Sequence, residues 1–156
     1  MKIPKLFLED SNLCIQFIRG FVDAEFSLVL KRRYKRLKYY PVIECNISSK
    51  KIHKQLIEIF EKMGLKPIGY RILEFDKRFG KYWEKYRIDL NGVENTIKFL
   101  SLFRPLNPRF YSGLKRLSKV LEKQPIRRKS YEKLVKFIKR WGSNSGARNF
   151  RCLGTF

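Results

Sequence analysis

The chain has 156 residues, the size of a single domain. Its 36 Lys and Arg against 14 Asp and Glu give a net charge of +22, and a hydrophobic content of 44% is enough to build a core. General disorder is therefore disfavoured, as is a membrane-spanning helix, because no apolar run approaches about 18 residues. The start of the chain lacks the apolar region of a signal peptide, so we expect an intracellular protein, in the cytoplasm or an organellar matrix.

The scarcity of cysteine and histidine argues against several kinds of site. Cys14, Cys45 and Cys152 are an odd number without C-x-x-C spacing, which disfavours a disulfide scaffold and a cysteine zinc site. The chain has one histidine, His53, so His-ligated metal centres and Ser-His-Asp chemistry are disfavoured as well. We expect His53 at the surface and not as a ligand, because it lies off the apolar stripe of its predicted helix.

The charge indicates a polyanionic partner. Residues 31–38 read K-R-R-Y-K-R-L-K, and residues 115–156 hold 13 basic and 2 acidic residues, half of the net charge. A membrane-surface protein would more often show one basic amphipathic helix, whereas here basic residues also lie in strand-like segments. Nucleic acid is therefore the expected partner, although charge alone does not separate DNA from RNA or a binder from an enzyme.

The first predicted elements are a helix, a β-hairpin and a second helix. The first helix covers residues 12–25, with Asp10, Ser11 or Asn12 as its cap and apolar residues on two sides. Alternation from Phe26 predicts a strand, residues 41–48 a second, and the link over residues 34–39 closes a hairpin. Ser48 or Ser49 then caps a helix that runs to residue 63 and ends at Gly64.

A second hairpin and three helices follow. Strands are predicted over residues 66–75 and 82–90, joined by a loop with Gly80, and a helix over residues 93–103. Basic helices are predicted over residues 111–123 and 130–141. The order α-β-β-α-β-β-α with C-terminal helices indicates an α+β fold with one four-stranded antiparallel sheet. We expect residues 1–125 to form one domain and residues 126–156, a basic helix and tail, to pack on it.

Residues 18–26 read I-R-G-F-V-D-A-E-F, and this segment resembles the LAGLIDADG motif of homing endonucleases and related maturases. Gly20, Asp23, Ala24 and Glu25 match the third, sixth, seventh and eighth positions of the motif. Arg19 and Phe26 depart from it, because the family has a small second residue and usually a ninth-position Gly. The resemblance covers nine residues, and the order of predicted elements is similar to the family domain through about residue 103.

The resemblance implies a homodimer, since members with one motif pair their motif helices. The residues expected at that interface are Phe17, Gly20, Phe21 and Ala24. The small residues Gly20 and Ala24, four apart, would let a second helix backbone approach closely. Asp23 is expected to be mainly structural at the helix end.

The resemblance also implies a site-specific double-strand DNA endonuclease that cuts a long, pseudo-palindromic site and leaves 3′ overhangs. Glu25 would be the catalytic carboxylate and would bind Mg²⁺ together with Ala24. Arg109, with Lys115 as a competitor, would be the assisting basic residue, and Ser49 would order active-site water. Divalent metal ions activate water and clamp phosphate oxygens, and Mg²⁺ needs few protein ligands when DNA phosphates supply others.

Strand alternation predicts which side chains meet DNA, on the face of the sheet that the helices leave open. Arg71 is included although the face of its strand is ambiguous, and for Glu44 and Asp89 salt bridges to neighbouring cations are an equal alternative. The predicted DNA-binding residues are Val29, Lys31, Arg33, Lys35, Glu44, Asn46, Arg71, Lys85, Arg87 and Asp89.

Two other functions remain open on the same scaffold. An RNA maturase would assist intron splicing through its basic surface and would not need Glu25. A non-catalytic DNA-binding regulator would usually have lost the acidic residue, so the presence of Glu25 favours the endonuclease.

Overall fold

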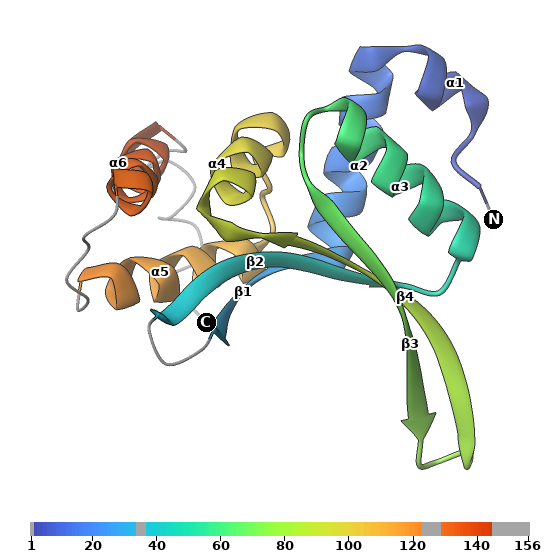
Figure 1. Cartoon of the computed structure of the whole chain (residues 1–156). Helices are drawn as coiled ribbons and strands as arrows, with labels where there is room; N and C mark the ends of the chain where they lie inside the picture. The colour runs from blue at the N-terminus through green and yellow to red at the C-terminus, as the bar shows by residue number, and fades with distance from the viewer. Residues whose placement is uncertain (1, 34–36, 123–128, 145–156) are drawn as a thin grey trace, which may run out of the picture.

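A computed structural model describes residues 2–33, 37–122 and 129–144 of the chain (Figure 1). The elements are α1 (Lys5–Glu9), α2 (Ser11–Glu25), β1 (Phe26–Arg33), β2 (Leu37–Ile47), α3 (Lys50–Lys62), β3 (Pro67–Asp76), β4 (Lys81–Asn91), α4 (Gly92–Phe103), α5 (Pro108–Glu122) and α6 (Lys129–Asn144). The predicted order α-β-β-α-β-β-α is confirmed from α2 to α4, with one short helix before it.

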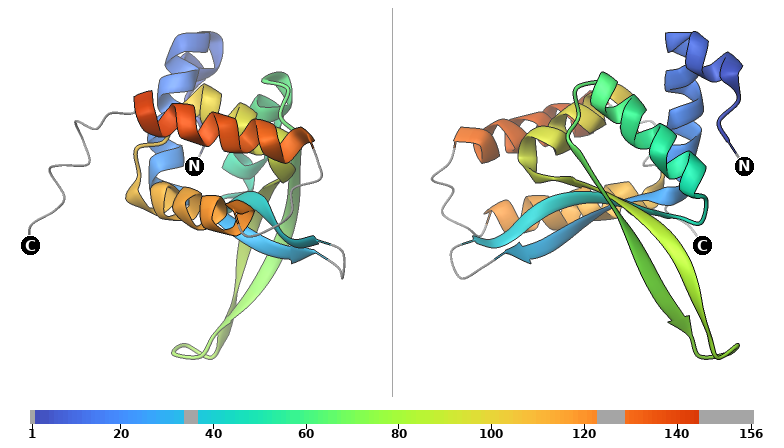
Figure 2. Two further views of the ribbon diagram at one scale, coloured as in Figure 1. Left: turned by 90° about the vertical axis from the view of Figure 1, so that its left-hand side faces the viewer. Right: turned by 45° about the vertical axis from the view of Figure 1, so that its right-hand side comes forward.

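The four strands form one antiparallel sheet in the order β1-β2-β4-β3, as the α+β prediction required. The register aligns the start of β1 with the two central strands, because Phe26 is opposite Cys45 and Cys45 is opposite Ile88. Helices α2, α3 and α4 pack against the sheet, and the β3–β4 hairpin extends well beyond them (Figures 1 and 2). The outer end of that hairpin is therefore solvent-exposed on both faces.

Local capping explains where α2 and α3 begin and end. The Asp10 carboxylate accepts the backbone N–H groups of Asn12 and Leu13 at 2.7 and 3.0 Å, so Asp10 is the cap among the three predicted candidates. Ser49 caps α3 by accepting the N–H of Ile52 at 3.4 Å. Gly64 follows α3 with φ of +71°, a left-handed conformation that favours glycine.

An aromatic cluster fills the core between the helices and the sheet. Phe26 is 1% exposed, and its ring lies 5.8 Å from that of Phe60 and 5.6 Å from that of Phe99. The departure from the motif's ninth-position Gly thus adds a large core side chain that points into the helical layer. Edge-to-face and tilted contacts at these distances are favourable aromatic geometries.

The C-terminal helices close the other end of the core. α5 lies along the edge strand β1, and Gly113 permits that approach, since a Cβ there would lie 2.5 Å from the Leu28 carbonyl oxygen. α6 packs on α4 and α5 through buried side chains that include Leu134. Residues 123–128 and 145–156 lie outside the described part of the chain, so the predicted tail is not described.

The structure corrects three expectations about the elements. α1 was not predicted, because five residues are too short to show a period. β2 begins at Leu37 and not at residue 41, so this strand is longer than predicted. α5 begins at Pro108 and not at residue 111, because proline is well tolerated at the first helical position, where no intrahelical N–H partner is needed.

His53 is buried, which corrects its expected surface position. It is 8% exposed, and its Nε2 lies 3.1 Å from the Arg87 carbonyl oxygen, to which it donates. Its ring also lies 5.4 Å from that of Tyr86, so His53 ties α3 to β4.

Among the helices of the described ranges, none has both the length and the apolar character that spanning a membrane requires.

Candidate active site and nucleic-acid interface

Helix α2 has one buried side and one open side. Cys14, Ile18 and Val22 point into the core, whereas Leu13, Gly20 and Ala24 are exposed. A Cβ atom added to Gly20 would meet nothing within 4 Å. Phe17 and Phe21 are half-buried beside this open side, and their rings lie 6.5 Å apart. The helix therefore presents small and apolar residues to its surroundings along the side predicted to form a dimer.

Glu25 is the last residue of α2 and leads directly into β1. Its side chain is exposed, and it makes no hydrogen bond or ion pair with any side chain that the structure describes. Carbonyl groups in the last turn of a helix have no intrahelical partner, and that end of the helix dipole favours cations. The Glu25 carboxylate and the Ala24 carbonyl are thus available oxygen donors at one position.

Asp23, by contrast, makes hydrogen bonds that hold the fold together, as predicted for a mainly structural residue. Its Oδ1 accepts the backbone N–H groups of Leu106 and Asn107 at 2.7 and 3.1 Å. The Asn107 side-chain amide donates in return to the Asp23 carbonyl oxygen. These bonds fix the loop before α5 to the end of α2.

The same loop brings Arg109 to the end of α2. Asn107 Oδ1 accepts the backbone N–H of Arg109 at 2.8 Å, which sets the start of α5. Arg109 and Ala24 line one open hollow together with Asp23 and Asn107. The Arg109 guanidinium has no partner among the described side chains, so an unpaired cation lies close to the residue that precedes Glu25. Lys115 lies six residues further along α5, is exposed, and does have an interaction partner.

Ser49 lies at the same end of the sheet as Glu25, because β2 ends where β1 begins. Its hydroxyl is engaged as the cap of α3. The predicted role in ordering water therefore has to be shared with a structural one.

Oxygen donors suit Mg²⁺, and the residues at the end of α2 fit it in kind. In the part of the chain that is described, no three His, Cys, Asp or Glu side chains cluster as a metal site. A single subunit therefore offers an open position with one carboxylate, not a closed cage.

The open face of the sheet carries a network of opposite charges, which we call the outer-face network: Lys31, Glu44, Arg87, Asp89 and Tyr70. Lys31 Nζ lies 3.1 Å from Glu44 and 2.7 Å from Asp89. Arg87 donates from Nε to Asp89 at 2.8 Å and also pairs with Glu44. The Tyr70 hydroxyl donates to Asp89 at 3.0 Å. The alternative of salt bridges for Glu44 and Asp89 is what the structure shows.

Ionisation in this network follows from its hydrogen bonds. Burial of Asp89 opposes its charge, but hydrogen bonds from Lys31, Arg87 and Tyr70 outweigh burial and hold its pKa below the usual range. Burial and the hydrogen bond to Asp89 raise the pKa of Tyr70 to about 12. Asp89 is thus charged and Tyr70 neutral near pH 7. The two cations and two carboxylates cancel, so the outer-face network has no net charge of its own.

The other predicted DNA contacts are divided between the two faces. Val29, Asn46 and Lys85 share the outer face with the network, as strand register shows. Arg71 pairs with Tyr86 in register and bonds Glu84 at 3.2 Å, so it lies on the opposite face. The side chain of Arg33 and the whole of Lys35 lie outside the described residues.

The chain matches no family model and no curated protein. Among solved structures, it is similar to an archaeal intron-encoded homing endonuclease, I-Vdi141I, solved in complex with DNA. That similarity has a TM-score of 0.43 and 17% sequence identity, and it covers 86% of this chain and all of the other.

Several exposed cations lie away from the outer-face network. Exposed cations follow one another along α5 and α6, at Arg116, Lys119, Lys133 and Lys136 among others. These helices would contribute to the long-range attraction of a polyanion. The network itself is suited to directional hydrogen bonds.

Two residues of the site were not predicted. Asn107 joins Asp23 to Arg109, but an Asn before a Pro reads in sequence only as a turn. Tyr70 belongs to the outer-face network, and the strand alternation that placed Lys85 and Arg87 would have placed it too once the register of β3 was known.

Proposed function

We propose that the protein is a homodimeric, Mg²⁺-dependent endonuclease that cuts both strands of a long, pseudo-palindromic DNA site and leaves 3′ overhangs. The observation that carries the proposal is the state of Glu25. It is an exposed carboxylate at the end of the motif-like helix and makes no hydrogen bond or ion pair with a described side chain, whereas Asp23, Glu44 and Asp89 are all engaged.

Glu25 and the Ala24 carbonyl would hold the metal ion. When bound, Mg²⁺ supplies an activated water and neutralises charge on the phosphate that is attacked. Arg109, held beside the same helix end by Asn107, is suited to contact a phosphate oxygen. Ser49 is a candidate for positioning water at this end of the sheet.

A dimer would serve the chemistry, because one subunit supplies one carboxylate and two DNA strands are to be cut. Pairing two copies of α2 along the side of Gly20 and Ala24 would bring two Glu25 residues together, one for each strand. An isologous contact of this kind imposes twofold symmetry, which would be matched by a pseudo-palindromic site.

The outer-face network would read bases, and the cations of α5 and α6 would bind phosphates. Base edges are recognised by fixed donors and acceptors in the major groove, whereas phosphate contacts give affinity without sequence information. A neutral, hydrogen-bonded network on a sheet whose edge strand β1 packs on the basic helix α5 fits this division.

The test is a selection on a randomised duplex-DNA library with purified protein in Mg²⁺. Cleavage of one discrete long site, with 3′ overhangs and loss of activity in EDTA, is the expected result. Sedimentation of the protein–DNA complex should give two protomers per duplex.

Other outcomes of these binding and cleavage experiments would favour one of the two alternative functions. Specific binding without cleavage in Mg²⁺ or Mn²⁺ would favour a DNA-binding regulator. Binding of structured RNA in preference to any duplex DNA would favour an RNA maturase.

A further inference from the structure

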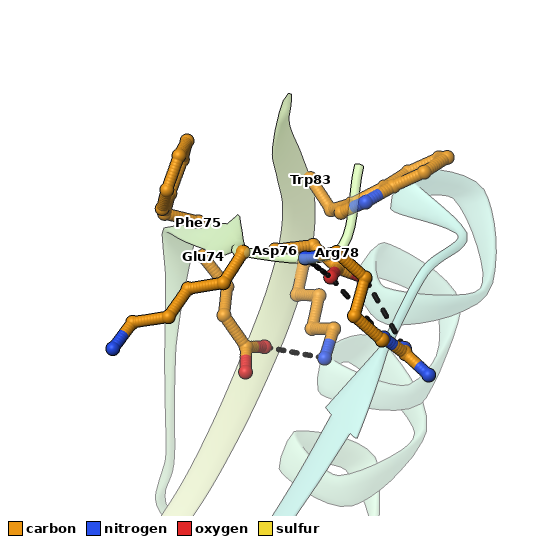
Figure 3. A pocket seen from close by; sticks show the side chains of 7 residues that line it. Glu74, Phe75, Asp76, Arg78 and Trp83 are labelled. Carbon is orange, nitrogen blue, oxygen red and sulfur yellow. Dashed lines mark hydrogen bonds and ion pairs between the residues drawn. The ribbon is translucent and has the colours of Figure 1, made fainter. Parts of the chain in front are cut away.

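The outer end of the β3–β4 hairpin is not used by the proposed active site or by the outer-face network. It extends away from the helices (Figure 2) and carries four exposed aromatic side chains: Phe75, Phe79, Tyr82 and Trp83. Phe75 and Trp83 point to opposite sides of the hairpin (Figure 3). Clustered exposed aromatic rings of this kind mark an interaction surface more often than isolated ones do.

Phe79 occupies the turn itself, in the segment that we call the hairpin tip: Lys77, Arg78, Phe79, Gly80 and Lys81. Its side chain is 64% exposed. The turn is held by Asp76, whose carbonyl and carboxylate oxygens accept the backbone N–H groups of Phe79 and Arg78 at 3.3 and 2.9 Å. Gly80, with φ of +61°, allows the chain to turn back into β4. The ring is therefore presented on an ordered turn.

The charges around Phe79 fit a polyanion. Three cations lie within two positions of Phe79 in the sequence, and the one neighbouring carboxylate, Asp76, is bonded to Arg78 at 3.2 Å. The Arg78 guanidinium also lies 5.7 Å from the centre of the Phe79 ring. Lys77 and Lys81 have no partner among the described side chains, so both are available for phosphate oxygens.

We propose that the hairpin tip is a DNA wedge, in which Phe79 inserts between adjacent base pairs while Lys77 and Lys81 hold the flanking phosphates. The inference rests on the proposed binding of duplex DNA. Apolar side chains that enter a base step partly unstack it and kink the duplex by about 20–90°. Pyrimidine–purine steps are the easiest to deform and would be preferred.

The strand register places the wedge relative to the outer-face network. Arg87 of the network and Lys81 of the tip both lie on β4, six positions apart, which corresponds to about 20 Å of extended strand. At about 3.4 Å per base pair, the tip would reach a step roughly six base pairs from the one that Arg87 contacts.

The test uses the full chain and a duplex recovered by selection, labelled at its ends for distance measurement by energy transfer. In parallel, 2-aminopurine is placed at successive positions to report unstacking. Wild-type protein should bend the duplex and raise the fluorescence at one step per half-site. Phe79→Ala should abolish both signals, and Phe79→Leu should retain part of them, because leucine also forms a wedge.

A matched control separates the tip from the rest of the hairpin. Leu73→Ala removes a comparably exposed apolar side chain from the middle of β3 and should leave both signals unchanged. Binding by wild type without bending or unstacking would overturn the wedge and leave the proposed function standing, as would signals that persist in Phe79→Ala. Absence of duplex binding would overturn both proposals.

Discussion

The carboxylate of Asp23 accepts the backbone N–H of Asn107 at 3.1 Å, and the Asn107 amide donates back to the Asp23 carbonyl. This reciprocal pair joins the end of α2 to the start of α5, and it thereby sets Arg109 beside Ala24. A motif position that is acidic for structural reasons therefore also fixes a cation beside Ala24, the residue that precedes the proposed catalytic carboxylate.

Replacing Asp23 should expose this coupling. Asp23→Ala removes the acceptor of two backbone N–H groups and should lower the free energy of unfolding by about 1–3 kcal/mol. Asp23→Asn keeps one acceptor oxygen, so its free energy of unfolding should lie between those of wild type and Asp23→Ala. Denaturant unfolding without DNA measures the effect. An Asp23→Ala protein as stable as wild type would contradict the clamp.

The dimer surface can be tested at Gly20, where a side chain has room in the single subunit. Gly20→Leu should leave the subunit folded, and it should gain up to about 1 kcal/mol from improved helix propensity. The same change should prevent close packing of two α2 helices, so sedimentation equilibrium should report a monomer. Glu58→Leu, which adds leucine to an exposed position of α3, is the control and should stay dimeric. A dimeric Gly20→Leu protein would show that another surface pairs the subunits.

Arg87 should read a guanine. Two of its donors are held by Glu44 and Asp89, and its remaining N–H groups suffice for a bidentate contact to O6 and N7. Arg87→Lys should lose about 1–3 kcal/mol of discrimination at one base pair per half-site without changing the salt dependence of binding. Lys119→Ala on α5 should instead weaken binding to all sequences and lower the salt slope by about one. Binding of site variants over a salt series checks both, and an unchanged base preference in Arg87→Lys would refute the base contact.

The outer-face network should make stability depend on acid. An aspartate in an unfolded chain has a pKa near 3.9, and that of Asp89 is lower in the folded protein. Its stabilisation is therefore complete above about pH 4 and is lost as the pH falls through the folded pKa. Asp89→Asn should be less stable at pH 7 and should show a flatter loss of stability below about pH 4. Parallel acid slopes for the two proteins would contradict this role.

Periodicity in the sequence was sufficient to predict the sheet and the helices that pack on it. Alternation placed Phe26 and Leu28 on the buried side and Lys31 on the open side, as the structure has them. It was insufficient for α1, which is too short to show a period. It was also insufficient for the start of β2, where residues 37–40 read L-K-Y-Y and do not alternate between apolar and polar residues. His53 was placed at the surface because its position lies off the apolar stripe, but a polar side chain can be buried there when a strand carbonyl accepts its N–H.

The candidate site was harder to predict because it depends on contacts between distant segments. Asp23 meets Asn107 across 84 positions, and Lys31 meets Asp89 across 58. Arg71 shows the limit on the sheet, since the apolar alternation of β3 does not tell which side packs on α3. The register with β4 decides which face each residue of β3 occupies, and it places Arg71 on the face of the sheet that does not carry the outer-face network.

The most direct measurement is cleavage of the selected duplex in Mg²⁺ by wild type, Glu25→Gln and the control Glu94→Gln, an exposed acidic residue in the first turn of α4. Metal ions supply several kcal/mol of transition-state stabilisation, so Glu25→Gln should cut about a thousandfold more slowly while binding the duplex as wild type does. Glu94→Gln should cut at the wild-type rate. A Glu25→Gln protein that still cuts within about tenfold of wild type would contradict the assignment of Glu25 and, with it, the proposed active site.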